Sequence, residues 1–363
     1  MKLTRALAAS GVLTLALTAA ACGTTDSDNG APSSDVPTSN AAGCDGDIAT
    51  STDPVSLTDG LGRTVELDKP ARRVAVLEWQ EIEDAISLCV DPVAVASPDS
   101  YSEYVSAEKL PEGVVNAGER GEPDFDALFG ADPDLIIYET FDADDEILKK
   151  LEERDVPVLV TKGADTADQI GNVKDVMSMI GEATGRSERA AQLNKEFDDA
   201  VAATKEKVAD TVAALPTNKF LYMDGWVESG NLTVRPYTSG ALMTQMGEQL
   251  GLTSAWTDEI NRSYGSGGVD PQFGLAQTDI EGLTAVGDAN LFFSGATQAA
   301  DDPENYVTAM EKNPIWDNLP AVKDKRTAQF SSSLWTAGGP RSCIALLDAY
   351  VEALNEISGQ TSR

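Results

Sequence analysis

Short apolar runs alternate with helical patterns along most of the chain from about residue 55 onward. The runs are apolar throughout, which is typical of strands buried on both faces of a sheet. Between them, apolar residues recur every three or four positions, as in amphipathic helices. This alternation predicts an α/β architecture with parallel strands. The expected strands cover residues 74–77, 93–96, 135–138 and 157–160 in the first half and residues 220–223, 291–293 and 327–330 in the second.

A long helical pattern separates these two groups of strands. Apolar side chains recur every three or four residues through residues 187–215, and Pro216 marks the end of the pattern. A helix of roughly 25 residues or more would be about 40 Å long. We therefore expect two Rossmann-like lobes, residues 55–186 and 216–363, joined by one long rigid helix and separated by a cleft.

The first 21 residues have the pattern of a secretory signal peptide. Lys2 and Arg5 precede an uncharged, largely apolar run over residues 6–21, which is too short to span a bilayer comfortably. Cys22 follows three alanines, and this arrangement resembles a bacterial lipobox, in which the cysteine is acylated and becomes the mature N-terminus. We expect a signal peptide over residues 1–21 and lipidation of Cys22. An ordinary secreted protein with a conventional cleavage site is the alternative.

Residues 22–54 separate this leader from the first lobe. Ser, Thr, Asp, Asn and Gly dominate positions 24–43, and such a composition cannot bury enough apolar surface to offset the entropy lost on ordering. We interpret the segment as a flexible tether. Together with a lipid on Cys22, it predicts a monomer anchored on the extracellular face of a bacterial cell membrane.

Charge and composition exclude several functions. The chain has 27 basic and 60 acidic side chains and no histidine. Nucleic acid is not an expected partner, because phosphate binding needs clustered Lys and Arg. The absence of histidine excludes Ser-His-Asp and Cys-His catalysis and the imidazole ligands of common metal receptors. We predict no enzyme activity, no protein metal site and no cofactor.

Three cysteines follow the predicted lipid site. In an oxidising compartment two of them should pair and one should remain free. Cys44 precedes the first lobe and Cys89 lies on its first predicted helix, so we favour this pair and expect Cys343 to be the spare. The other pairings stay open at this point.

Four motifs resemble those of the siderophore- and cobalamin-binding proteins of ABC importers. They occur in the family's order and span almost the whole expected body, from about residue 55 to 358. The resemblance implies two lobes with little hinge bending and a shallow cleft whose loops, at the strand ends, face the ligand. The motifs cover residues 57–65 with 70–74, residues 118–128 with 133–137, residues 313–316, and residues 335–342.

The leading functional hypothesis is capture of a ferric siderophore. Such iron chelates are bulky and often anionic, so a receptor needs guanidinium groups for the ligand oxygens and aromatic faces for the rest. The resemblance points to Arg120, in the loop before the expected helix around Asp126, and to Arg235, in a loop after the first strand of the second lobe. For Arg120, the alternative is a salt bridge to one of the many surface acids.

Aromatic residues near strand ends complete the predicted site. The strongest candidates are Tyr237 beside Arg235, Trp226 and Trp79. Four further aromatic residues are weaker candidates, and the alternative for Tyr101 and Tyr138 is a half-buried core position, which is common for Tyr at strand ends. The four are Tyr264 in a Gly/Ser-rich loop, Trp335, Tyr138 and Tyr101.

The resemblance also implies a surface that docks on the ABC permease. Relatives present one acidic residue on each lobe, and the matching positions here are Asp126 and Glu281. Asp126 departs from the glutamate that is usual in the family. The alternative is that both are ordinary solvated carboxylates.

Other functions remain to be distinguished from siderophore transport. Haem or cobalamin binding by the same fold is the nearest alternative. A sensory or adhesive lipoprotein without a permease is a second. No acidic pair has a motif that places it opposite another as in a glycosidase.

Overall fold

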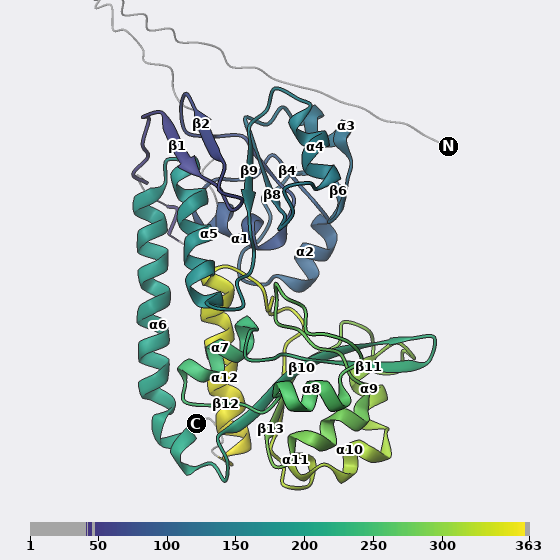
Figure 1. Cartoon of the computed structure of the whole chain (residues 1–363). Helices are drawn as coiled ribbons and strands as arrows, with labels where there is room; N and C mark the ends of the chain where they lie inside the picture. The colour runs from purple at the N-terminus through teal and green to yellow at the C-terminus, as the bar shows by residue number, and fades with distance from the viewer. Residues whose placement is uncertain (1–40, 42, 46–47, 360–363) are drawn as a thin grey trace, which may run out of the picture. The chain divides into compact units, whose positions relative to one another are not determined.

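The computed structural model describes residue 41, residues 43–45 and residues 48–359. Within the compact unit Pro37–Arg363, two α/β lobes follow one another along the chain, and a long helix connects them (Figure 1). This confirms the predicted fold class.

A five-stranded parallel sheet forms the centre of the N-terminal lobe, in the order β5-β4-β3-β8-β9. Val76 and Ile137 belong to one hydrophobic core, whereas Ala75 and Ile136 belong to another. Because side chains alternate along a strand, these central strands are buried on both faces, which explains why they are apolar throughout. The strands are β3 (Val74–Val76), β4 (Ala94–Val95), β5 (Val115–Asn116), β8 (Leu135–Glu139) and β9 (Val158–Thr161).

Helices and two short hairpins complete this lobe. The sequence-based strand positions were correct for β3, β4, β8 and β9, whereas the two-residue strand β5 was missed. The helices are α1 (Trp79–Ser87), α2 (Pro98–Tyr104), α3 (Phe125–Gly130), α4 (Glu146–Glu152) and α5 (Gln169–Ala183). The hairpins pair β1 (Val55–Thr58) with β2 (Thr64–Leu67) and β6 (Gly118–Glu119) with β7 (Glu122–Pro123).

The C-terminal lobe has a mixed sheet in the order β11-β10-β13-β14, with β12 also paired to β10. All pairs are parallel except the β10–β11 hairpin. The strands are β10 (Lys219–Glu228), β11 (Asn231–Pro236), β12 (Thr253–Ser254), β13 (Asn290–Ser294) and β14 (Thr327–Phe330). The helices are α7 (Leu242–Gln249), α8 (Asp258–Tyr264), the 3₁₀ helix η1 (Ile280–Val286), α9 (Tyr306–Glu311), α10 (Pro314–Asn318), α11 (Pro320–Lys323) and α12 (Pro340–Ile357).

The connecting helix α6 (Ser187–Ala214) has 28 residues and runs beside both lobes (Figure 1). Its Leu193 belongs to a core of the N-terminal lobe, and its Phe197 and Val208 belong to a core of the C-terminal lobe. Helix α12 packs along α6. The long apolar stripe that predicted the helix therefore serves two cores in succession.

Apart from α6, the two lobes are also connected by direct contacts between side chains. Residues 331–339, which we call the crossing segment, lead from β14 to α12 and contact the N-terminal lobe. The Trp335 ring lies edge-on to Trp79 of α1, with ring centroids 4.8 Å apart. At the start of α12, the Ser342 backbone N–H and hydroxyl donate to the Glu83 carboxylate of α1, with an N–O distance of 2.8 Å. The lobes are thus joined at this seam as well as by α6.

A disulfide joins Cys44 to Cys89, with the Cα atoms 5.6 Å apart, and Cys343 is free and buried. The favoured pairing is confirmed, although Cys89 lies just after α1 rather than on it.

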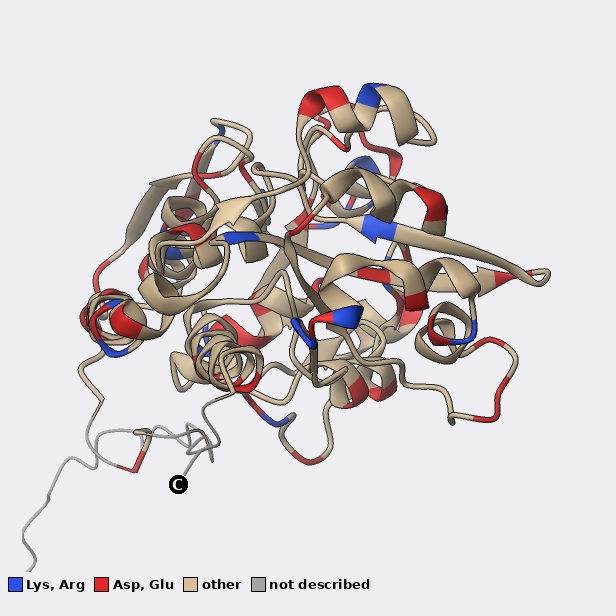
Figure 2. Ribbon diagram, turned by 90° about the horizontal axis from the view of Figure 1, so that it is seen from below, with Lys and Arg blue, Asp and Glu red and all other residues tan. Residues whose placement is uncertain are grey.

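Acidic residues are spread over both lobes and greatly outnumber the basic ones (Figure 2). None of the helices in the described part of the chain has the length and apolar composition needed to cross a membrane.

Candidate ligand-binding site

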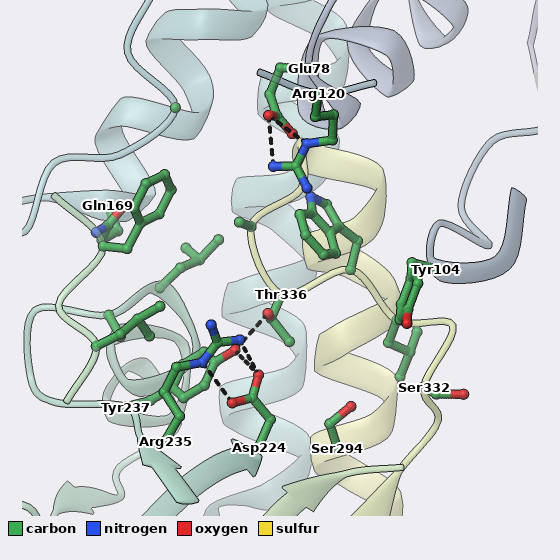
Figure 3. A pocket seen from close by; sticks show the side chains of 18 of the residues that line it. Glu78, Tyr104, Arg120, Gln169, Asp224, Arg235, Tyr237, Ser294, Ser332 and Thr336 are labelled. Carbon is green, nitrogen blue, oxygen red and sulfur yellow. Dashed lines mark hydrogen bonds and ion pairs between the residues drawn. The ribbon is translucent and has the colours of Figure 1, made fainter. Parts of the chain in front are cut away.

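A cavity of about 340 Å³ lies between the two lobes (Figure 3). The N-terminal lobe, the C-terminal lobe and the crossing segment all contribute to its wall. Its charged residues are Glu78, Arg120, Glu139, Asp224 and Arg235; its other polar and aromatic residues include Tyr104, Gln169, Tyr237, Phe273, Ser294, Ser332, Trp335 and Thr336; its aliphatic residues include Leu242, Leu275 and Leu334.

The sheet topology brings these side chains together. Glu78 follows β3, Glu139 is the last residue of β8, and Gly163 follows β9. These strands are neighbours in one parallel sheet, so their carboxyl ends meet at the same edge. Ser294 ends β13 and Ser332 follows β14 in the other sheet. Both lobes therefore use the carboxyl edge of their parallel strands, which is where open α/β sheets bind ligands.

Arg120 occupies the turn between β6 and β7 and is held by three neighbours. Its Nε and Nη2 donate to Glu78 Oε2 at 2.8 and 2.7 Å. Its guanidinium carbon lies 4.4 Å from the centroid of the Trp79 ring and 5.3 Å from that of Trp335. Both distances are within the range of cation–π attraction. Burial raises the pKa of Glu78, and the charge of Arg120 opposes that rise.

Arg235 is held by an ion pair across the β10–β11 hairpin. It lies directly opposite Asp224 in the strand register, and its Nε and Nη2 donate to the two carboxylate oxygens at 2.8 and 2.5 Å. Such a two-point contact is the strongest geometry for this pair. The Tyr237 hydroxyl donates to Asp224 Oδ2 at 3.0 Å and lies 3.0 Å from the Thr336 hydroxyl of the crossing segment. Burial raises the pKa of the Tyr237 hydroxyl, and Asp224 adds to the rise.

Glu139 differs from the other two carboxylates of the wall. Within the described residues it forms no ion pair. Its pKa is well above its usual range, because burial disfavours the charge and because Glu81 and Glu78 lie nearby. The fully buried Glu81 has its pKa raised to about 7, also chiefly by burial. The N-terminal wall of the cavity therefore has two carboxyl groups for its single arginine, and burial favours the protonated form of Glu139.

Four of the predicted ligand residues line the cavity, namely Arg120, Arg235, Tyr237 and Trp335. Arg235 lies on strand β11, not in a loop as expected. Two further predicted residues lie just behind the wall. Trp79 is 6% exposed, and its ring packs against both Arg120 and Trp335. Trp226 lines a neighbouring hollow, where Arg235 lies 5.8 Å from its ring.

The three remaining tyrosines are placed away from the cavity. Tyr101 is fully buried and donates to the backbone oxygen of Glu108 at 3.0 Å. Tyr138 is buried on β8, with its hydroxyl donating to Asp145 at 3.2 Å. Tyr264 ends α8 and is 46% exposed. The first two are core tyrosines whose hydroxyl groups are satisfied inside the protein, and the third faces solvent.

The sequence analysis missed the carboxylates Glu78, Glu139 and Asp224. A signal for all three was present, because each one ends or directly follows a predicted apolar strand.

The candidate docking residues Asp126, in the first turn of α3, and Glu281, in the first turn of η1, are both exposed. Cys22 lies outside the described residues. Across residues 41, 43–45 and 48–359 no group of His, Cys, Asp and Glu is arranged to hold a metal ion.

Two lobes that enclose a cavity at the carboxyl ends of their strands define a solute-binding protein. The chain belongs to the periplasmic binding protein family, whose model matches residues 74–333. The iron-uptake system-binding protein of Bacillus subtilis is 23% identical over 354 residues, which cover 95% of this chain and 97% of that protein.

Two solved structures show the same fold. The siderophore-binding protein FhuD of Vibrio cholerae, in complex with Fe³⁺-Desferal, is 22% identical with a TM-score of 0.63, covering 79% of this chain and 98% of that one. The triscatecholate siderophore-binding protein FeuA of Bacillus subtilis, in complex with ferri-bacillibactin, is 20% identical with a TM-score of 0.61, covering 85% and 99%.

Proposed function

We propose that this protein captures a ferric siderophore outside the cell and delivers it to an ABC import permease. The observation that carries the proposal is the cavity itself. Two guanidinium groups, an indole and two phenol rings converge on it from both lobes. The ligand supplies all the ligands of its own iron, so no metal-binding side chains are needed. Relatives that bind ferric siderophores support this assignment.

Titration of the protein with ferric chelates tests the capture step. Ferric trihydroxamate, triscatecholate and citrate complexes should be added separately while tryptophan fluorescence is followed, since Trp335 lies in the wall and Trp79 directly behind it. We expect saturable quenching by at least one class. Haemin and cyanocobalamin serve as competing ligands. Saturation by either of these, with no response to any ferric chelate, would contradict the proposal.

Delivery to a permease is tested at the two exposed carboxylates. The charge reversals Asp126→Arg and Glu281→Arg should abolish uptake of labelled ferric siderophore by cells while leaving binding by the purified protein unchanged. The matched control is Glu352→Arg, an exposed glutamate on α12. Normal uptake by the double variant would remove these residues from the docking surface. No siderophore-dependent uptake even with the unmodified protein would favour the sensory or adhesive role.

The predicted lipid anchor has its own test. The proposal requires residues 1–21 to be removed and Cys22 to carry the lipid. Cells that express the Cys22→Ala variant should release the protein from the membrane fraction, and labelled palmitate should no longer be incorporated. Retention of the variant in the membrane would contradict anchoring through Cys22.

A further inference from the structure

The charges of the cavity restrict which ferric siderophores it can hold, if it binds ferric siderophores as proposed above. Three carboxylates and two guanidinium groups line it, and no lysine does so among the described residues. With all groups ionised, the wall carries a net charge of one negative unit; with Glu139 protonated, it is neutral. The protein around it has 60 acidic against 27 basic side chains. Neither the wall nor the chain as a whole carries an excess of positive charge.

Both guanidinium groups are already engaged by carboxylates. Arg120 pairs with Glu78 at 2.7 Å, and the Glu78 side chain is only 12% exposed. Arg235 pairs with Asp224 at 2.5 Å, and the Asp224 side chain is only 17% exposed. An anionic ligand that took over either arginine would leave a largely buried carboxylate without its partner, which is costly. It would also bring its own negative charge close to that carboxylate.

The arginines nevertheless keep donors for a neutral ligand. The ion pairs use Nε and Nη2 of each guanidinium group, and each has further N–H groups. Their side chains remain 35% and 36% exposed. A neutral oxygen acceptor can therefore receive a hydrogen bond without displacing Glu78 or Asp224 (Figure 3).

The common chelating groups differ in charge. Three catecholates carry six negative charges against the three positive charges of Fe³⁺, and citrate complexes are also anionic. Three hydroxamates carry three negative charges, so their ferric complex is neutral and presents carbonyl-type oxygens. The aliphatic side chains of Leu242, Leu275 and Leu334 in the wall suit the hydrocarbon linkers between hydroxamates.

We propose that the cavity selects ferric trihydroxamates, which are neutral or carry a cationic side group, and rejects anionic catecholate and carboxylate complexes. The two ion pairs Glu78–Arg120 and Asp224–Arg235 set this selectivity. A ligand ammonium group is compatible with the site, because Glu139 lacks an ion-pair partner within the described residues. The shared fold leaves the choice open, since FhuD and FeuA bind complexes of different classes.

The first test compares affinities of the unmodified protein at pH 7.5. Ferric desferrioxamine B is the trihydroxamate probe, and a ferric triscatecholate and ferric citrate are the anionic probes. We expect the trihydroxamate to bind about 100-fold more tightly than either, because like charges placed together cost several kcal/mol. Equal or tighter binding of an anionic complex would overturn the selectivity proposal and leave the proposed function intact. Failure of every ferric complex to bind would overturn both.

The second test removes the anionic partners of both arginines. In the double variant Glu78→Gln, Asp224→Asn both guanidinium groups lose their anionic partners, so affinity for the triscatecholate should rise about 10-fold or more. Affinity for the trihydroxamate should change less. Glu352→Gln on α12 is the control and should leave both affinities unchanged. If the double variant keeps native circular dichroism and a cooperative melt but gains no affinity for the triscatecholate, the ion pairs do not set selectivity.

Discussion

Tyr237 joins three parts of the cavity wall through a single hydroxyl group. The hydroxyl donates to Asp224 on β10, and it contacts Thr336 of the crossing segment. Tyr237 is 4% exposed, so its hydroxyl depends mainly on these two partners for hydrogen bonding. The hydroxyl therefore contributes to stability as well as to the shape of the site.

Replacement of Tyr237 by phenylalanine should lower the free energy of unfolding by about 1–2 kcal/mol, because Asp224 and Thr336 would each lose a buried hydrogen-bond partner. Urea denaturation measures the change. The control is Tyr264→Phe, at an exposed position, which should alter stability by less than about 0.5 kcal/mol. Equal stability of the Tyr237→Phe variant and the unmodified protein would contradict this role.

Glu81 makes stability depend on pH. Its Oε1 accepts a hydrogen bond from Thr161 at 2.5 Å, whereas Oε2 has no partner among the described residues. Burial raises its pKa to about 7 from the ordinary value of 4.5, and Glu78 adds to the rise. Between these pH values the folded protein keeps a proton that the unfolded chain has released. The free energy of unfolding should therefore fall as the pH rises from about 4.5 to 7.

The variant Glu81→Gln removes this titration. It should match the unmodified protein at pH 4 and exceed it at pH 8, by up to about 3 kcal/mol. Thermal melts at the two pH values measure the difference. Glu352→Gln, at an exposed position on α12, should leave the pH dependence unchanged. A Glu81→Gln variant whose stability still falls as steeply with pH would assign the effect to other groups.

Residue identities in the site were only partly predictable from the sequence. Arginines are scarce, so Arg120 and Arg235 could be selected, and both line the cavity. Carboxylates are abundant, and among the 60 acidic residues only their position directly after predicted apolar strands sets Glu78 and Asp224 apart in the sequence. Their importance lies in the side chains that they pair with, which depends on the folded arrangement.

At the scale of elements, strands and helices with strong periodicity were predicted well. Helix α6 ends within one residue of the predicted boundary because its apolar stripe is long and Pro216 follows closely. Strand β11 was expected to be a loop. The Ser229-Gly230 dipeptide and the β-branched Thr233 and Val234 were available sequence signals of a hairpin.

The entry to α12 depends on a glycine. A Cβ atom added at Gly339 would lie 1.9 Å from Asp84 Oδ1 and 3.2 Å from Glu83 Oε1, both on α1, in which every residue is buried. The backbone of α12 can approach α1 this closely only without a side chain at this position. The seam between the lobes is therefore sterically tight as well as hydrogen-bonded.

The substitution Gly339→Ala should destabilise the protein by about 1–3 kcal/mol, because the fully buried Asp84 side chain or the two helices must shift to admit the methyl group. The change can be measured by thermal or urea denaturation. Gly130→Ala serves as the matched control, since an added Cβ at Gly130 meets no atom within 4 Å. Similar stability of the two variants would show that the seam is looser than the structure indicates.

For the whole molecule, the two connections between the lobes limit relative motion. Opening the cavity requires bending α6 and also separating Trp335 from Trp79 and Ser342 from Glu83. We expect the Cα atoms of one lobe to shift by less than about 1 Å relative to the other lobe when a ferric siderophore binds. Crystal structures with and without ligand measure this. A relative shift of more than about 2 Å would indicate large closure and contradict the expectation.

The contacts that join the lobes at α12 have a consequence for the rate of import. If the protein delivers its ligand to a permease as proposed and keeps nearly the same outline with and without ligand, a permease that docks on both lobes would bind the loaded and the unloaded form almost equally well. Unloaded molecules would then compete with loaded ones for the permease. Import should consequently be fastest at an intermediate abundance of the protein and should slow down when cells overproduce it relative to the available iron chelate.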